Sequence, residues 1–259
     1  MSDWYNEIGK GYAGLRIPDR RIATLIHEAL GNIDTVANIG AGTGSYEPPN
    51  RDVLAIEPSI LMLKQYKGTG KRVQGTAESM PLGTDSVDAT MGILTIHHWE
   101  NWKKGLAEMF RVSRNVAVLL THKPDLDDFW LFDYFPLIRD IDRRIFSSIE
   151  EIEAEVNLNQ WALEMITVPV PCDCTDGFLG AYWQRPRAYF SSEVRRSIST
   201  FNLLDSDLIE RALAQLRRDL DSGAWNERYG HLNDIEELDI GYRILKMTPI
   251  RKKLTAGNT

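Results

Sequence analysis

The sequence lacks the long apolar run that marks a transmembrane helix. Its 259 residues contain no stretch of about 18 consecutive apolar residues, the length needed to cross a bilayer. The first residues also lack the basic segment and the following apolar segment of a signal peptide. From these two absences we expect a cytoplasmic protein without a membrane partner.

Cysteine is scarce as well. The chain has two, Cys172 and Cys174, which are too few for the disulfide framework of a small secreted domain. Two thiols one residue apart also cannot complete a tetrahedral zinc site without help from histidine or carboxylate ligands. We expect two reduced thiols in a loop at a strand end, and no metal site.

Positive charge is in short supply. The chain has 37 acidic against 30 basic residues, a formal charge of -7, and no basic cluster longer than the three residues 251–253. Because nucleic-acid binding usually needs a basic face, nucleic acid is not an expected partner. Hydrophobic residues, by contrast, make up an ordinary 43% of the chain, which is enough for the core of a globular protein.

Seven short apolar runs predict the strands of a sheet. They lie at residues 35–39, 52–57, 71–75, 87–96, 115–120, 162–170 and 238–247. Over the first half these runs alternate with helical patterns such as 59–66 and 102–110, which is the order of parallel β-α-β units. We therefore predict an α/β fold with a Rossmann-like, doubly wound, mostly parallel seven-stranded sheet.

The second half carries insertions into this pattern. Residues 125–160 are rich in aromatic and acidic side chains, and residues 191–222 are strongly helical. About 65 residues separate the last two predicted strands, too many for a plain hairpin connection. We predict a single domain over residues 1–259, with insertions at about 125–160 and 173–237 that form a helical cap. The helices at 191–222 either cover the pocket or pair with a second subunit, as in a homodimer.

A glycine-rich turn follows the first predicted strand, in the run Asn38-Ile39-Gly40-Ala41-Gly42-Thr43-Gly44. Closely spaced glycines at the carboxyl end of a parallel strand let the backbone approach a ligand. The spacing is G-x-G-x-G, whereas a dinucleotide fingerprint would place its third glycine at position 45. The next strand ends in Glu57, where a carboxylate can accept hydrogen bonds from both hydroxyls of a ribose.

In order and spacing these residues resemble the class I S-adenosylmethionine-dependent methyltransferases, and within them the small-molecule branch related to the ubiquinone-biosynthesis methyltransferases. The resemblance covers residues 35–120. Besides the glycine turn and Glu57, it rests on the runs Gly75-Thr76-Ala77-Glu78-Ser79-Met80-Pro81-Leu82, Asp85-Ser86-Val87-Asp88 and Ile96-His97-His98-Trp99. It implies S-adenosylmethionine as the cofactor.

The resemblance also implies which residues contact each part of that cofactor. They are Gly40, Gly42 and Gly44 under the methionine part, Glu57 at the ribose, Ser59 and Ile60 beside the adenine, Thr76, Ala77 and Glu78 at the adenine edge, and Thr95, Ile96 and His97 near the methionyl end.

Three features depart from the family pattern. Asn38 stands where the family usually has an acid that contacts the cofactor's ammonium, and Thr76 stands where it often has Asp. The link at residues 45–50 is short and holds two prolines, so the helix that normally follows the first strand is predicted to be missing or truncated.

The N-terminal segment offers a second set of cofactor contacts. Tyr12 and Arg16 are four residues apart within a helical pattern at 12–30 that is interrupted near Pro18, so they share a face. An arginine fork can clamp a carboxylate. One hypothesis is that this segment closes over the cofactor with Arg16 on its carboxylate; the alternative is a surface arginine.

Methyl transfer mainly requires that donor and acceptor be aligned and water excluded. A base is needed only where the acceptor arrives protonated. The candidate bases are His97, His98, His122, Asp128 and Asp173, and the two adjacent histidines could instead serve as packing for the cofactor. Asp176 lies in the same loop as Asp173, and residues 178–189 are predicted to form a wall of the substrate pocket.

The function predicted from the sequence is methyl transfer from S-adenosylmethionine to a small molecule, in specialised metabolism. One alternative is a cyclase that closes the cofactor's own amine into azetidine-2-carboxylic acid and releases methylthioadenosine, which a neutral Asn38 would permit. A second alternative is a non-catalytic S-adenosylmethionine-binding protein, which would not need an aromatic cap.

Overall fold

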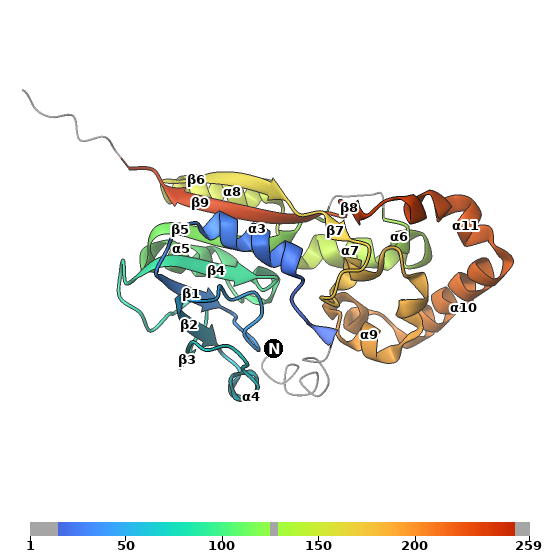
Figure 1. The fold of residues 1–259 in the computed structure, drawn as a ribbon, viewed down its shortest axis with the longest axis horizontal. Helices are drawn as coiled ribbons and strands as arrows, with labels where there is room; N and C mark the ends of the chain where they lie inside the picture. The colour runs from blue at the N-terminus through green and yellow to red at the C-terminus, as the bar shows by residue number, and fades with distance from the viewer. Residues whose placement is uncertain (1–14, 125–128, 252–259) are drawn as a thin grey trace, which may run out of the picture.

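A seven-stranded sheet lies at the centre of the computed structural model, which describes residues 15–124 and 129–251. The strand order is β3-β2-β1-β4-β5-β9-β6 (Figure 1). The bounds are β1 (Thr35–Ile39), β2 (Asp52–Glu57), β3 (Lys71–Gln74), β4 (Val87–Ile93), β5 (Ser113–His122), β6 (Trp161–Thr167) and β9 (Tyr242–Pro249). The first five strands are parallel, and β9 is antiparallel to both of its neighbours. The predicted fold class is confirmed.

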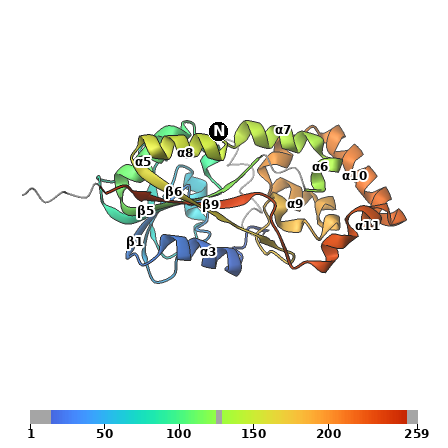
Figure 2. The same cartoon turned by 90° about the horizontal axis from the view of Figure 1, so that it is seen from above.

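Helices cover both faces of the sheet, as Figure 2 shows from above. Helix α3 (Arg20–Leu30) packs on one face, and α5 (Trp102–Val112) and α8 (Ile149–Leu158) on the other, while α4 (Ile60–Lys64) joins β2 to β3. Neighbouring strand residues such as Val36 and Ala37 belong to different core clusters, because successive side chains of a strand point to opposite faces. A sheet covered on both sides is what parallel strands require.

No helix joins β1 to β2; residues 40–51 form turns instead. The prediction that the usual first helix is missing is therefore confirmed. Two residues of this link other than glycine, Tyr46 and Asn50, have φ values of 63° and 61°, a left-handed conformation that is costly for an aromatic residue. The Tyr46 side chain is buried and belongs to the same core cluster as Ile22 and Ile26 of α3, and its carbonyl accepts a 3.0 Å hydrogen bond from His27 Nε2. Helix α3 thus takes part in holding the link in place.

A separate group of helices stands at one end of the sheet, and we call it the helical lobe (Figure 1). It contains α6 (Leu131–Tyr134), α7 (Pro136–Ile145), α9 (Ser192–Arg196), α10 (Ser206–Ser222) and α11 (Ala224–Tyr229), with the 3₁₀ helix η4 (Ser199–Leu203). A short ribbon of β7 (Val170–Pro171) and β8 (Glu237–Leu238) leads into it. Aromatic rings form its core, and two are tied down by hydrogen bonds, from Trp130 Nε1 to the Trp183 carbonyl and from the Tyr189 hydroxyl to the Leu179 carbonyl, each 2.6 Å long.

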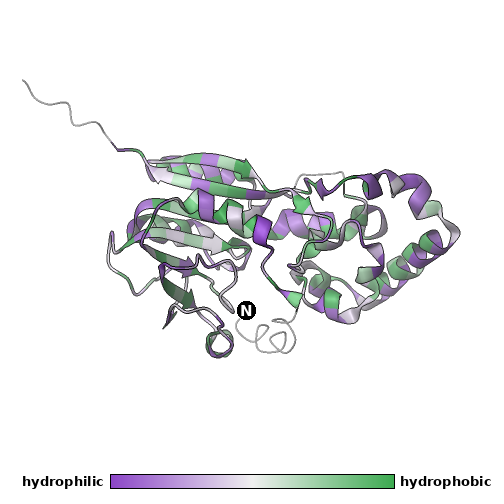
Figure 3. Ribbon diagram, viewed as in Figure 1, coloured by the Kyte–Doolittle hydropathy of each residue, from purple (hydrophilic) through white to green (hydrophobic). Residues whose placement is uncertain are grey.

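The expected insertion at 125–160 is divided between the lobe and the sheet. Helices α6 and α7 belong to the lobe, but α8 packs on β6 and α5. Its buried residues Ile149, Ile152 and Val156 follow the spacing of an apolar helix face, and they join the core between the sheet and α5. In Figure 3 the central strands are largely hydrophobic, whereas hydrophobic and hydrophilic residues alternate along α10. This alternation is expected for a helix with one solvated face.

The last predicted strand begins later than expected. Residues 237 and 238 pair with β7, and β9 begins only at Tyr242. Gly241, with φ of 94°, turns the chain between the two strands.

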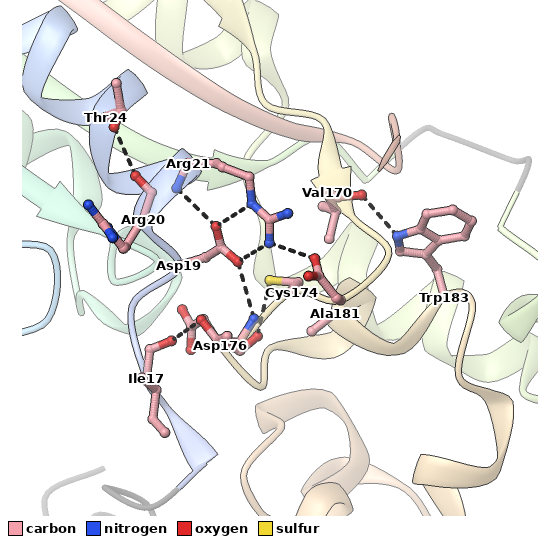
Figure 4. Close-up of polar contacts among 12 residues, drawn as sticks. Ile17, Asp19, Arg20, Arg21, Thr24, Val170, Cys174, Asp176, Ala181 and Trp183 are labelled. Atoms are coloured by element: carbon pink, nitrogen blue, oxygen red, sulfur yellow. Dashed lines mark hydrogen bonds and ion pairs between the residues drawn. The ribbon is translucent and has the colours of Figure 1, made fainter. Parts of the chain in front are cut away.

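The N-terminal segment is held against the loop that follows β7. Asp19 caps α3 by accepting a hydrogen bond from Arg21 N at 3.0 Å, and it also accepts one from Thr175 N at 3.2 Å. Figure 4 shows Asp19 between the Arg21 side chain and the loop that carries Cys174 and Asp176. Burial alone would raise the pKa of Asp19, but the hydrogen bonds from Arg21 and Thr175 hold it below its ordinary value. These contacts hold the start of α3 against the loop after β7, and Arg16 pairs with Asp176 of the same loop.

Both cysteines are free, with Cys174 buried in this loop. Within 15–124 and 129–251, no helix is long and apolar enough to span a bilayer.

We expect Ile152→Ala to destabilise the protein by about 2–5 kcal/mol, because the side chain is fully buried between α8 and the sheet. Urea unfolding measures the change. Glu153→Ala, on the exposed side of the same helix, is the control and should change stability by less than about 0.5 kcal/mol. Equal effects of the two substitutions would contradict the placement of α8 on the sheet.

Candidate functional site

The glycine turn has the backbone conformation that its sequence predicts. Gly40, Gly42 and Gly44 have φ values of 67°, 54° and 90°, where a side chain is strained. A Cβ at Gly40 would also lie 2.1 Å from Thr95 Oγ1, so a larger residue would push the turn out of place. The N–H groups of Gly40 and Ala41 donate to the Ile56 carbonyl at 2.9 and 3.0 Å. The turn is thus anchored to β2 and lies against Thr95.

A cavity of about 640 Å³ opens over this turn. Its size falls within the range of ~300–1,000 Å³ that is usual for small-molecule sites. It lies at the carboxyl ends of β1, β2 and β4, the edge where ligands of open α/β sheets bind. The predicted site residues that line it are Arg16, Gly40, Gly42, Glu57, Ser59, Thr76, Ala77, Glu78, Thr95 and His98.

Glu57 is held in place by backbone donors. Its Oε2 accepts from Gly42 N at 3.0 Å, and its Oε1 accepts from Ser59 N at 2.9 Å. Burial raises the pKa of Glu57, and these two hydrogen bonds oppose the rise. A carboxylate has about four acceptor positions, so each oxygen keeps one for a ligand hydroxyl.

The far wall of the cavity contains residues that the sequence analysis did not select. Trp99, Asn101 and Lys104 line it together with Met62 of α4. Asn101 N donates to Glu78 Oε1 at 3.1 Å, which ties this wall to the predicted adenine edge. The sequence carried one signal, a glycine at position 105 inside the predicted helix 102–110. In the structure a Cβ at Gly105 would lie 2.5 Å from the Trp99 ring, so this helix requires a glycine there.

Four predicted cofactor residues with described positions line neither cavity. Ile60 is 54% exposed at the start of α4. Asn38 is buried and donates from Nδ2 to Glu47 Oε1 at 3.0 Å, Gly44 packs against the Tyr66 ring, and Ile96 lies in the core under α5. The structure therefore turns the Asn38 amide toward the link between β1 and β2, where Glu47 also accepts from the Tyr66 hydroxyl.

Arg16 lines the cavity and is already engaged by a carboxylate. Its Nε lies 2.5 Å from Asp176 Oδ1, and its second fork nitrogen is 3.3 Å from Oδ2. Asp176 Oδ2 also accepts from the Tyr46 hydroxyl at 2.9 Å. A contact between Arg16 and a cofactor carboxylate remains a prediction.

The structure does not bring Asp173 to the site. Its side chain is 73% exposed and pairs with Arg21 at 2.7 Å, because the loop turns this residue toward the start of α3. Asp173 therefore lines neither of the two cavities that the other predicted residues approach. Tyr12, predicted to contact the cofactor, and Asp128, predicted as a candidate base, lie outside the described residues.

A second, smaller cavity of about 50 Å³ adjoins the first. Arg16, Leu94 and His98 line both. His97, His122 and Asp142 line only the smaller one, coming from the 3₁₀ helix η1 (Ile96–His98), from β5 and from α7. The His97 ring centroid is 3.8 Å from that of His98.

The environment of this second cavity shifts the titration of its side chains. Burial lowers the pKa of His98 and of His122 to about 4, and it lowers the pKa of His97 in the same direction. Burial raises the pKa of Asp142 to about 7, against a hydrogen bond from Thr200. The histidines are therefore neutral at neutral pH.

Asp142 is a site residue that sequence reasoning missed, although a signal was present. It lies on the same helical stripe as Ile138, Ile141 and Ile145, a position that an apolar residue normally takes. A carboxylate there is 1% exposed, and a buried acid beside a cavity is a functional candidate. Over the two described ranges, no group of three or more His, Cys, Asp or Glu residues is arranged to hold a metal ion.

Comparison with known proteins matches residues 37–121 of the chain to a family model described as a methyltransferase domain. A solved structure from Anabaena variabilis, described as a methyltransferase from an antibiotic biosynthesis pathway, is 37% identical. The match covers 90% of this chain and 98% of that one, with a TM-score of 0.84.

Two curated relatives match over shorter stretches. The 2-methyl-6-phytyl-1,4-hydroquinone methyltransferase 2 of Oryza sativa subsp. japonica is 30% identical over 39% of this chain and 32% of its own length. The demethylmenaquinone methyltransferase of Renibacterium salmoninarum is 32% identical over 37% of this chain and 44% of its own length. The chain thus spans less than half the length of these two relatives.

Gly40→Ala should weaken binding of S-adenosylmethionine at least tenfold, because the new Cβ would be strained at φ of 67° and would collide with Thr95. Isothermal titration calorimetry measures the dissociation constant. Gly83→Ala is the matched control, since a Cβ there meets nothing within 4 Å. Unchanged binding by the Gly40 variant would refute the role of this turn.

The stability of the protein should depend on pH through Asp142. The folded state holds its proton up to about pH 7, whereas the ordinary value is 3.8. Stability gained from this group is therefore complete below about pH 4 and is lost as pH rises to 7, with a slope of at most about 1.4 kcal/mol per pH unit. Relative to the wild type, Asp142→Asn should gain stability across that window.

Urea unfolding of both proteins at pH 5, 6, 7 and 8 measures this difference. The histidines titrate in both proteins, so their contribution cancels. A difference that does not change with pH would show that Asp142 titrates normally.

Proposed function

Because the chain belongs to the class I S-adenosylmethionine-dependent methyltransferase family, we propose that it transfers the methyl group of S-adenosylmethionine to a small-molecule acceptor. The observation that carries the proposal is the pair of adjoining cavities that share Arg16, Leu94 and His98 as lining. The larger cavity, over the glycine turn, suits the cofactor. The smaller cavity leaves a place beside it for an acceptor.

The residues present fit this cofactor. The glycine turn admits a ligand where a Cβ at Gly40 would collide with Thr95, and Glu57 keeps acceptor positions for two hydroxyls after its backbone hydrogen bonds are counted. When bound, the cofactor supplies an electrophilic methyl group on a sulfonium. The family predicted from the motifs is confirmed, while the narrower quinone-related branch has only the partial matches to hydroquinone and menaquinone methyltransferases in its favour.

The chain's own contribution to the reaction is to bind, orient and exclude water. Glu57 orients the ribose end, and the side chains of Leu94 and Trp99 give the cavity walls that displace solvent. His98 stands where the two cavities meet. Its pKa of about 4 leaves it uncharged at neutral pH, so it does not repel a sulfonium.

Two observations support a small acceptor. The second cavity holds about 50 Å³, which suits part of a small molecule and not a macromolecular segment. The Anabaena structure is described as coming from an antibiotic biosynthesis pathway, which supports a place in specialised metabolism. The cytoplasmic location, the absence of a nucleic-acid partner and a homodimer remain predictions from the sequence.

Mass spectrometry of the products tests the proposal. The protein is incubated with methyl-labelled S-adenosylmethionine and a panel of small hydroxylated aromatics, hydroquinones and amines. We expect S-adenosylhomocysteine together with a labelled acceptor, and a loss of turnover of about tenfold or more in Glu57→Gln, because the amide nitrogen in place of one carboxylate oxygen cannot accept a hydroxyl proton.

Methylthioadenosine formed without any acceptor would contradict methyl transfer and identify the cofactor as the substrate of a cyclisation. Tight cofactor binding with no turnover across the panel would favour a non-catalytic binding protein.

A further inference from the structure

Three residues that line the small cavity each have one buried polar atom without a hydrogen-bond partner among the described residues. These atoms are His97 Nδ1, His122 Nδ1 and Asp142 Oδ2. Leaving such an atom unpaired costs about 1–3 kcal/mol, and buried polar groups are nearly always paired. Three of them around one cavity are explained by a ligand group that pairs with them when it enters.

The hydrogen bonding of His122 identifies which kind of group that is. Its Nε2 lies 3.0 Å from the Ile240 carbonyl. A carbonyl only accepts, so Nε2 carries the proton. In a neutral imidazole the other nitrogen is then a bare acceptor. His122 Nδ1 therefore offers a lone pair to a hydrogen-bond donor.

The His122 ring is held in this orientation on several sides. It lies edge-on to Phe146, with centroids 5.4 Å apart, and is tilted against Tyr242 at 5.1 Å. A Cβ at Gly241 would lie 2.9 Å from His122 Nε2. The glycine at that position leaves room for the ring. The side chain is 6% exposed, so Nδ1 is a fixed, desolvated acceptor.

The surrounding charges disfavour a charged donor. Arg16 lines the cavity and repels a cation, although Asp176 partly neutralises it. Asp142, which accepts a 2.9 Å hydrogen bond from the neutral Thr200 hydroxyl, repels an anion whenever it is ionised. A neutral group that can donate a hydrogen bond is repelled neither by the positive charge of Arg16 nor by the negative charge of Asp142.

We propose that the small cavity is the subsite that receives a neutral hydroxyl group of the methyl acceptor, with His122 Nδ1 as the atom that accepts its hydrogen bond. A volume of about 50 Å³ holds the equivalent of one or two water molecules at ~30 Å³ each, which suits a hydroxyl but not a whole ring. The acceptor class is therefore an alcohol or phenol whose body extends past Leu94 and His98 toward the larger cavity.

The inference rests on the proposed function, and binding measurements separate the two. The protein is saturated with S-adenosylhomocysteine, so that no methyl group is available, and titrated with phenol, toluene and benzylamine. Toluene has a methyl group of similar size where phenol has its hydroxyl, and benzylamine carries a positive charge at neutral pH. We expect phenol to bind more tightly than either.

His122→Gln is the informative variant. The glutamine amide can still donate to the Ile240 carbonyl, but it places no acceptor where Nδ1 was. We expect phenol binding to weaken about three- to tenfold, the loss of one neutral hydrogen bond, while the affinities for toluene and S-adenosylhomocysteine stay the same. His231→Gln, the same substitution at an exposed histidine, should change none of the three.

Nitrogen NMR of the wild-type protein gives a second readout that needs no variant. Phenol should shift the Nδ1 resonance of His122, and toluene should not. Equal binding of phenol and toluene, tighter binding of benzylamine, or equal loss of phenol and toluene in His122→Gln would overturn the inference alone. Failure of S-adenosylhomocysteine to bind would instead contradict the proposed function, and the inference with it.

Discussion

The buried carboxylate of Asp176 joins the parts of this protein that make the site. It is 1% exposed and accepts hydrogen bonds from Arg16 and from the Tyr46 hydroxyl. These partners come from the N-terminal segment and from the link after the glycine turn, while Asp176 itself leads into the helical lobe. A buried carboxylate is costly unless it is paired, so each segment needs the others in place. The common wall of the two cavities depends on this junction, because Arg16 lines both.

In the proposed function the two cavities hold different molecules, the cofactor in the larger one and part of the acceptor in the smaller one. The larger one includes the glycine turn, whose shape depends on left-handed backbone conformations. The smaller one is lined by side chains that include those of η1, β5 and α7. The first arrangement suits a cofactor that is the same throughout a family, and the second can change with the acceptor. A fold shared with other methyltransferases therefore says little about the acceptor, and the chemistry of the second cavity carries that information.

The neutral state of the histidine cluster follows from the same enclosure. Burial holds the pKa of His98 and His122 near 4, and the positive charge of Arg16 acts in the same direction on His97 and His98. An uncharged, desolvated imidazole accepts hydrogen bonds without repelling a cationic methyl donor next to it. The lobe helices that exclude water are thus part of the electrostatics of the site as well as its walls.

By itself the sequence determined the sheet, the glycine turn, the carboxylate at Glu57 and the missing first helix, because each depends on residues that are neighbours along the chain. Only the tertiary structure decided which acids reach the site. Asp173 and Asp176 belong to one loop, yet the first pairs with Arg21 at the surface and the second is buried against Arg16. Asn38, predicted to face the cofactor, is turned to Glu47. Asp142 of α7 lines the same small cavity as the histidines of η1 and β5. These contacts join residues far apart in the chain, so the path of the backbone between them selects which side chains meet, and no local pattern records that path.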